Sequence, residues 1–375
     1  MKNISKLFIV TALSFPALVS CSDNMGDTDS RLKAVDSFLE PADGKELALE
    51  ASAAASLYFE WDAVDAAASG TALYQVAFDT ADGDFSSPVY LLNSDNNGYR
   101  NYVTITHKVL NQIAGLAGIG ASETGTLKWT VYSTKGLKKL KASAEHRLTI
   151  TRLAGFEELP IDVYVTGEAS EGGSDFAKAP KMKAVAGGEF EAYTYLKAGK
   201  DFHFTDGSRT FFTKDGLIKE DGSSTVAEDG VYRITLDFNT GACSYSLVDR
   251  IGFYFSPEGK ILFDLPYVGY GVFQAKATVT FKQEGWGRDE RYKFRMFVRE
   301  DGGAAPEKEL EWSTLNGTDS RPNSTTPENY YYMKLIDNLT QWDNKWKLNG
   351  DFDGQEATYT IYLTADTPYT HSISK

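Results

Sequence analysis

The chain has 375 residues, of which 42% are hydrophobic and 13% aromatic, and its 52 acidic and 38 basic side chains give a formal net charge of −14. This composition is that of a globular protein long enough for two or three domains. Because binding to nucleic acid or to an anionic membrane surface depends on basic patches, the excess of negative charge argues against both classes of partner.

Residues 1–20 have the three parts of a secretion signal. Lys2 and Lys6 give a positively charged start, residues 7–18 form an apolar stretch, and small residues lead to Cys21. The apolar stretch is too short for a membrane-spanning helix, which needs about 20 apolar residues. The Leu-Val-Ser-Cys run that ends at Cys21 resembles a bacterial lipobox, which implies cleavage before this cysteine and its acylation. An ordinary cleaved signal with a chance cysteine is the alternative.

Residues 21–30 form a polar, acidic tether with neither strand nor helix periodicity. The tether resembles the leader that directs lipoproteins to the outer cell surface in Bacteroidota-type bacteria. A lipid anchor at Cys21 would hold the protein on the outer membrane, facing the cell exterior. The one other cysteine, Cys243, has no partner for an intramolecular disulfide. The fold must therefore be stabilised by burial, and Cys243 is expected to be a small core residue.

The first domain, residues 31–155, is predicted to be an immunoglobulin-like sandwich. A short helix is expected at 105–118 and a closing strand at 147–153. Trp61 and Trp129 lie within strand alternation and are expected in the core. The segments that alternate apolar and polar side chains, as half-buried strands do, are 57–61, 73–78, 101–106 and 127–133.

Two further all-β domains are predicted, a second domain at residues 156–249 and a third domain at residues 250–375. Both contain hairpin-like strands with glycine turns between them. The strand-like runs are 161–170, 188–207 and 230–247 in the second domain, and 251–257, 291–300, 328–336, 345–350 and 357–364 in the third. The predicted fold class is therefore all-β, with tandem β-sandwich domains.

The order of these features is similar to that of the SusE/SusF-type outer-membrane lipoproteins, which are starch-utilisation surface proteins of Bacteroidota. The motifs that carry the resemblance are the lipobox and acidic leader, then LYFEW, YQVAFD and LKWTVYS, and finally VYVTGEAS and LKAGKDFHFTDG. The resemblance implies carbohydrate-binding sandwiches, held away from the membrane by the first domain and without catalysis. It also implies a partnership with a TonB-dependent, SusC-like transporter and a SusD-like lipoprotein that captures glycan.

The sequence departs from this family in the second domain. Family sandwiches often carry a platform tryptophan, an exposed ring on which a sugar stacks, shortly after a G-x-A/S turn. Here the turn reads GEASEGGSDF (167–176), and residues 160–249 contain no tryptophan. We therefore expect the second domain to be a spacer, with weak binding through Phe176 or a tyrosine as the alternative.

The third domain is the main candidate for carbohydrate binding. A pyranose has an apolar face and a rim of hydroxyls, so a site needs an exposed aromatic ring with planar hydrogen-bonding side chains around it. Four of the six tryptophans follow residue 250, and a polar loop at 313–329 adds Asn316 and Asp319. The candidate glycan-binding residues are Trp286, Trp312, Trp342, Arg321, Asn323, Asn344 and Lys345. The alternative is that all four rings fill the core and the loop is only solvated.

Strand alternation separates two of these tryptophans. If residues 345–350 form a strand, Trp346 and Leu348 share one face, which makes Trp346 a core residue. Trp342 precedes the strand, so its ring need not follow the alternation. Trp342 is therefore the better platform candidate of the two.

A basic stripe lies in the same domain. Alternation over the run RDERYKFRMFVRE places four basic side chains on one strand face, namely Arg291, Lys293, Arg295 and Arg299. In so acidic a protein this face is a candidate contact for acidic or sulphated sugars. The alternative is a solvated face whose charges pair with the nearby Glu300, Asp301, Glu307 and Glu309.

Sequence signals for catalysis are weak. The four histidines have no metal-ligand spacing, and no nucleophile elbow, phosphate-binding loop or dinucleotide fingerprint occurs, so no metal or cofactor is predicted. DFDGQE (351–356) matches a calcium loop only in part and is better explained as a hairpin turn. The leading hypothesis is a non-catalytic, surface glycan-binding lipoprotein. An adhesion or scaffold protein is the alternative, and a glycoside hydrolase is the third hypothesis.

Overall fold

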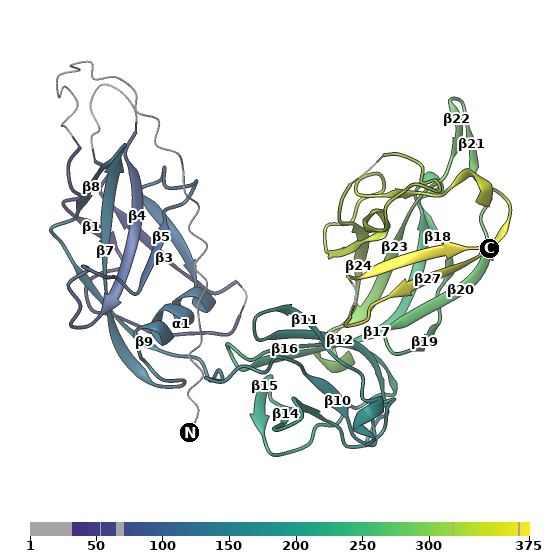
Figure 1. Ribbon diagram of the computed structural model, residues 1–375, viewed down its shortest axis with the longest axis horizontal. Coiled ribbons are helices and arrows are strands. Elements are labelled where there is room, and N and C mark those ends of the chain that lie inside the picture. The colour runs from purple at the N-terminus through teal and green to yellow at the C-terminus, as the bar shows by residue number, and fades with distance from the viewer. Residues whose placement is uncertain (1–31, 53, 65–70, 318, 367) are drawn as a thin grey trace, which may run out of the picture.

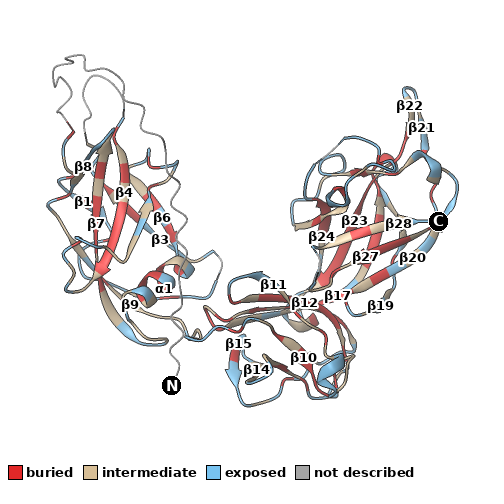
Figure 2. Ribbon diagram, viewed as in Figure 1, coloured by how far each residue is buried: buried red, intermediate tan, exposed pale blue. Residues whose placement is uncertain are grey.

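The computed structural model describes residues 32–375 except 53, 65–70, 318 and 367. The predicted signal, Cys21 and the acidic tether lie outside the described residues. Strands dominate the described part of the chain, which contains one α-helix and a few short 3-10 helices, so the prediction of an all-β fold is confirmed. Buried residues lie mainly on the strands of each domain, and exposed residues lie mainly on the loops and hairpin tips (Figure 2).

Two sheets enclose one apolar core in the first domain (Figure 1). One sheet has the strand order β2-β9-β7-β4-β5 with β8 beside β7, and the other has the order β1-β3-β6. Trp61 and Trp129 are fully buried in this core, as predicted. The predicted helix is α1 (His107–Leu116), which begins where the Thr106 side chain caps it. The strands are β1 (Phe38–Glu40), β2 (Lys45–Ala48), β3 (Ser56–Trp61), β4 (Leu73–Thr80), β5 (Tyr90–Asn93), β6 (Tyr102–Thr106), β7 (Thr124–Lys135), β8 (Lys138–Lys141) and β9 (His146–Thr151).

The second domain is built on the strand order β10-β13-β14-β15-β17-β16-β12-β11. Its apolar core contains phenylalanine and tyrosine rings, and its sheet continues into the next domain across β17. The elements are β10 (Tyr164–Thr166), a 3-10 helix (Phe176–Lys178), β11 (Lys183–Ala186), β12 (Glu189–Leu196), β13 (His203–Thr205), β14 (Thr210–Lys214), β15 (Leu217–Glu220), β16 (Gly230–Asp237) and β17 (Ala242–Phe255).

The third domain extends the same sheet, because β18 and β23 pair with β17, β24 and β26 pair with β23, and β25 pairs with β24. A separate sheet, β19-β20-β27-β28, and a hairpin, β21-β22, complete it. The strands are β18 (Lys260–Asp264), β19 (Tyr267–Gly269), β20 (Val272–Thr278), β21 (Lys282–Glu284), β22 (Gly287–Asp289), β23 (Arg291–Arg299), β24 (Glu307–Thr314), β25 (Met333–Ile336), β26 (Trp346–Lys347), β27 (Glu356–Tyr362) and β28 (Thr370–Ser374). The 3-10 helices are Ser256–Glu258, Asp301–Gly303, Glu328–Tyr331 and Gly350–Phe352.

Strand β17 joins the second and third domains. It pairs with β16 from Ala242 to Val248, and farther along the chain with β18 and β23. Its register with β23 is irregular between Val248 and Arg250, and such irregularities bend a strand. The predicted boundary after Asp249 therefore falls inside a bent strand, and not in a linker.

Side-chain hydrogen bonds also hold these two domains together. Glu171, in the GEASEGG turn, accepts from the Tyr267 hydroxyl (2.7 Å) and from the Tyr270 backbone N–H (2.8 Å). The Tyr369 hydroxyl donates to Glu191 (2.7 Å). The GEASEGG turn, where a platform tryptophan was looked for, thus contacts the third domain.

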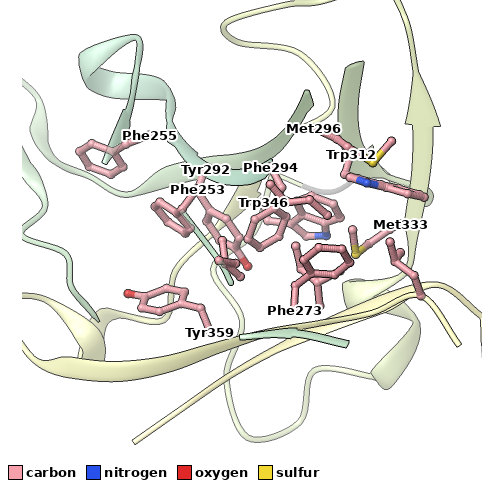
Figure 3. Packing of buried hydrophobic residues seen from close by; sticks show 14 of the residues in the cluster. Phe253, Phe255, Phe273, Tyr292, Phe294, Met296, Trp312, Met333, Trp346 and Tyr359 are labelled. Atoms are coloured by element: carbon pink, nitrogen blue, oxygen red, sulfur yellow. The ribbon is translucent and has the colours of Figure 1, made fainter. Parts of the chain in front are cut away.

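Aromatic rings fill the centre of the third domain (Figure 3). Phe253 and Tyr292 stack with their ring centroids 5.1 Å apart, and Tyr359 meets Phe253 from the separate sheet. Trp346 is fully buried beside them, and its indole N–H donates to the Tyr330 carbonyl (2.8 Å). The prediction that Trp346 belongs to the core is confirmed.

Replacing Trp346 by alanine should destabilise the protein by about 3–5 kcal/mol, because the truncation leaves a cavity in a closely packed core. Trp342→Ala is the matched control, since 43% of Trp342 is exposed. This control should change the free energy of unfolding by no more than about 0.5 kcal/mol. Urea denaturation measures both values, and equal losses in the two variants would contradict the different placement of the two rings.

Candidate functional site

Two of the three candidate platform tryptophans are exposed. Trp286 is 68% exposed at the tip of the β21–β22 hairpin, which projects from the end of the third domain (Figure 1). Trp342 is 43% exposed in the loop between β25 and β26. Its position before β26 agrees with the expectation that it does not follow the alternation that buries Trp346 and Leu348.

Trp312 does not belong with them. It lies on β24, is only 1% exposed, and packs against Tyr193 of the second domain and Tyr369. A ring covered on this side by a neighbouring domain has no free face for a sugar. The expectation that Trp312 is a platform residue is therefore corrected to a core role.

The two exposed rings share one neighbour, the guanidinium of Arg291 at the start of β23. Its Cζ lies 4.4 Å from the centroid of the Trp342 ring and 5.8 Å from the centroid of the Trp286 ring. Cations at these distances from an aromatic face are attracted to it. Arg291 thus brings together two rings from separate loops.

A cavity of about 400 Å³ lies at this cluster. This volume is within the range of small-molecule sites, roughly 300–1,000 Å³. Of the candidate residues, Trp286 and Arg321 line it directly, and Lys345 contacts it through Asp319, whose carboxylate lies 3.2 Å from the lysine Nζ. The lining residues are Trp286, Asp289, Glu290, Arg291, Asp319, Arg321 and Lys347.

Two carboxylates of the cavity are buried, and each is held by an arginine. Asp289 accepts from Arg291, with Nε and Oδ1 2.8 Å apart. Glu290 accepts two hydrogen bonds from Arg321, at 2.6 and 2.7 Å. Burial raises the pKa of Asp289, but hydrogen bonds from Arg291 outweigh this effect and hold the pKa below its usual value. Both carboxylates therefore orient arginines instead of facing solvent.

Asp319 is arranged in the opposite way. Its side chain is 75% exposed, and its Oδ1 lies 3.2 Å from the Nζ of Lys345 and 3.5 Å from the Nζ of Lys347. The hydrogen bond from Lys345 lowers the pKa of Asp319. One exposed carboxylate therefore serves two lysines.

Trp342 is not a lining residue and reaches the cavity through Arg291, and the candidates Asn323 and Asn344 do not line the cavity either. The Asn323 side chain accepts from the backbone N–H and the hydroxyl of Thr325, so it shapes its own loop. Asn344 has a positive φ of 52°, and its carbonyl accepts from the Thr314 N–H (3.1 Å). The contacts of both residues are those of turn formers.

The basic stripe divides into three parts. Arg291 belongs to the cavity, and Arg299 pairs with Glu228 (3.0 Å) and Asp249 (3.2 Å) near the domain junction. Lys293 and Arg295 are buried. Arg295 pairs with Glu309 (3.2 Å), as the second alternative expected. Neither a solvated face nor a sugar-binding face describes Lys293 and Arg295, however, because a distant loop covers them.

The covering loop is the one that carries Trp342. Lys293 Nζ donates to Glu311 (2.9 Å), to the Thr340 carbonyl (2.6 Å) and to the Thr340 hydroxyl (2.7 Å). Arg295 donates to the same carbonyl (2.8 Å) and pairs with Glu311 (3.0 Å). Burial lowers the pKa of Lys293, as expected when an ammonium is desolvated. Thr340 thus fixes the loop two residues before Trp342.

Sequence reasoning did not assign Asp289, Glu290 and Lys347 to the site, and it named Arg291 only as part of the basic stripe. The run WGRDER, which follows the hairpin turn, was the available signal, because it places two arginines and two acids beside an exposed ring. Asp353 has a supporting role here, since its Oδ1 accepts from Arg288 (2.6 Å) and from the Phe281 N–H (2.8 Å) at the base of the hairpin. Among the described residues, no group of three or more His, Cys, Asp and Glu side chains is arranged to hold a metal ion.

Comparison with known proteins bears out the family resemblance for the first part of the chain. Residues 27–132 match the family model described as "SusE outer membrane protein". A similar solved structure is the crystal structure of SusF from Bacteroides thetaiotaomicron, with 12% sequence identity, coverage of 88% of this chain and 74% of that chain, and a TM-score of 0.25. No curated protein matches the sequence. No helix in the described part of the chain is long and apolar enough to cross a membrane.

Thr340→Val should destabilise the protein by about 1–2 kcal/mol, because it removes one of the acceptors of the buried Lys293 ammonium. Thr325→Val is the matched control, since the Thr325 hydroxyl donates to Asn323 on an exposed loop. The control should stay within about 0.5 kcal/mol of the wild type. Chemical denaturation measures both variants. If Thr340→Val were as stable as the control, the hydroxyl would not contribute to anchoring the loop.

Proposed function

Residues 27–132 match the SusE outer membrane protein family. On this basis we propose that the protein is a non-catalytic glycan-binding lipoprotein of the outer membrane. The observation that supports the proposal is the pair of exposed rings, Trp286 and Trp342, whose centroids lie 5.8 Å and 4.4 Å from the Arg291 guanidinium. Trp286 and Arg291 line a cavity of about 400 Å³. Poly- or oligosaccharide is the ligand, and the third domain is its main binding site.

The chemistry of the cavity fits a sugar. An exposed indole face takes the apolar C–H face of a pyranose, and charged planar groups take its hydroxyls. Arg291 and Arg321 are already oriented by buried carboxylates, so little conformational entropy is lost when they bind a ligand. The loop that carries Trp342 is also held in place, because the Lys293 ammonium donates to the Thr340 carbonyl.

A glycoside hydrolase is the less favoured function of this cavity. Glycosidases need one carboxyl group with a raised pKa as the acid. Asp289 has a lowered pKa because Arg291 donates to it, and Glu290 accepts two hydrogen bonds from Arg321. Adhesion to a protein partner is also less favoured at this surface, because it is hollowed and charged instead of flat and apolar.

The second domain acts as a spacer in this proposal. Residues 160–249 contain no tryptophan, and Glu171 of its glycine-rich turn is engaged with Tyr267 and Tyr270 of the third domain. Delivery of the captured glycan would be to a TonB-dependent, SusC-like transporter and its SusD-like lipoprotein. The partnership with these two proteins follows from the SusE resemblance.

Trp286→Ala and Trp342→Ala should each weaken glycan binding about tenfold, the equivalent of about 1.4 kcal/mol, because each removes one stacking surface. The measurement is affinity for the best ligand of a glycan array, with the detergent-solubilised full-length protein. Tyr99→Ala removes a ring that is 55% exposed in the first domain and serves as the matched control. Wild-type affinity in both tryptophan variants, or a full-length protein that binds no glycan, would refute the proposal.

Cys21→Ala should release the protein from the membrane fraction, because the acyl chains on this cysteine are proposed to be its anchor. Fractionation of cells that express each form shows where the protein lies, and mass spectrometry of the wild type shows whether residue 21 is acylated. A variant that stays in the membrane fraction, or an unacylated wild type, would contradict the lipid anchor.

A further inference from the structure

The charged side chains at the cavity differ widely in exposure. The carboxylates of Asp289 and Glu290 are 2% and 3% exposed, whereas the Arg321 side chain is 48% exposed. Lys345 and Lys347 are 22% and 23% exposed. Asp289 and Glu290 therefore lie beneath the surface, so a ligand would meet the guanidinium of Arg321, the two lysines and the exposed carboxylate of Asp319.

The cavity has more charged hydrogen-bond donors than free acceptors. Arginine and lysine side chains can only donate, and ionised carboxylates can only accept. Because the Asp289 and Glu290 carboxylates accept from arginines, Asp319 is the one well-exposed carboxylate among the residues that line the cavity. The hydroxyls of a neutral sugar both donate and accept, so their protons would find few free acceptors here apart from Asp319. A group that only accepts matches them better.

We infer that the glycan bound at this site carries an anionic group, either a uronate carboxylate or a sulfate. This inference rests on the proposed function and names the substrate class of the same site. The anionic group takes the place of Asp319 between Lys345 and Lys347, while the sugar ring stacks on Trp286 or Trp342. In the free protein Asp319 is the intramolecular competitor for these two lysines.

The geometry supports this exchange. Asp319 lies within 3.5 Å of both lysines, so an anion at its position meets two ammonium groups at once. Its exposed pair with Lys345 contributes little stability, as surface ion pairs generally do. The protein as a whole has a net charge of −14, which repels polyanions, so a local basic surface is needed to hold one. That surface lies beside the two exposed tryptophans.

The experiment compares glycans that differ in charge, with the detergent-solubilised full-length protein and affinity measured at two salt concentrations. Polygalacturonate and alginate carry carboxylates, a sulfated galactan carries sulfates, and neutral galactan and amylose carry neither. Polyglutamate is a polyanion without sugar rings. The variants are Asp319→Asn and the double variant Lys345→Gln/Lys347→Gln.

The matched controls break a similar pair at the other end of the β23–β24 ladder, where Lys308 lies opposite Val298 and pairs with Glu300 at 3.0 Å. Lys308→Gln and Glu300→Gln change the net charge by the same sign as the site variants. Neither control should alter glycan affinity more than about twofold, because exposed charges this far apart are screened by salt.

The inference expects at least one acidic glycan to bind more tightly than its neutral counterpart, with an affinity that falls as salt rises. The double lysine variant should lose about tenfold in affinity. Asp319→Asn should gain about threefold, because the competing carboxylate is gone. Carboxylate-bearing and sulfated ligands distinguish the two sources of the anion.

Three results would overturn the inference. Equal binding of neutral and acidic glycans, weakened by Trp286→Ala but not by the lysine variant, would leave the proposed function intact and remove its acidic substrate. If polyglutamate bound as tightly as the acidic glycans, the site would bind any polyanion and would not recognise a sugar. Binding of no glycan at all would refute the proposed function together with the inference.

Discussion

A buried charge cluster decides the shape of the candidate site. The side chains of Lys293 and Glu311 are fully buried, and Arg295 is nearly so. Charges in such a position are costly unless they are paired and hydrogen-bonded. The Thr340 carbonyl and hydroxyl supply acceptors for both cations. Because the loop backbone is part of the cluster, the loop cannot leave the sheet without stranding buried charges, and Trp342 stays beside Arg291.

Strand β23 links this cluster to the surface. Alternation places Arg291, Lys293 and Arg295 on one face, the first at the cavity and the next two beneath the loop. The periodicity was correctly predicted from the sequence, but the environment of the face was not. Period two tells which side chains share a face. It does not tell whether a loop 45 to 47 residues later in the chain will cover the face.

The same limit explains why the burial of some tryptophans was predicted correctly and that of Trp312 was not. Trp61, Trp129 and Trp346 lie within clear alternation, and their burial was correctly predicted. Trp312 was assigned to the site because a polar loop follows it, yet it faces Tyr193 of another domain. Contacts between domains leave no local pattern, so the sequence could not reveal this one. The β21–β22 hairpin, in contrast, has glycines on both sides of Trp286, a local signal for a turn in which the exposed ring could be predicted.

The continuity of β17 has a consequence for the position of the site. A strand shared by two domains, together with the Glu171 and Glu191 hydrogen bonds, makes the second and third domains one mechanical unit. At the other junction Lys108 of α1 pairs with Glu189 and Asp237, so the first domain is also tied to the second. The hairpin with Trp286 lies at the far end of this series (Figure 1). In the proposed function, the second domain would hold the candidate site of the third domain away from the proposed N-terminal lipid anchor, because its interfaces with both neighbours restrict bending.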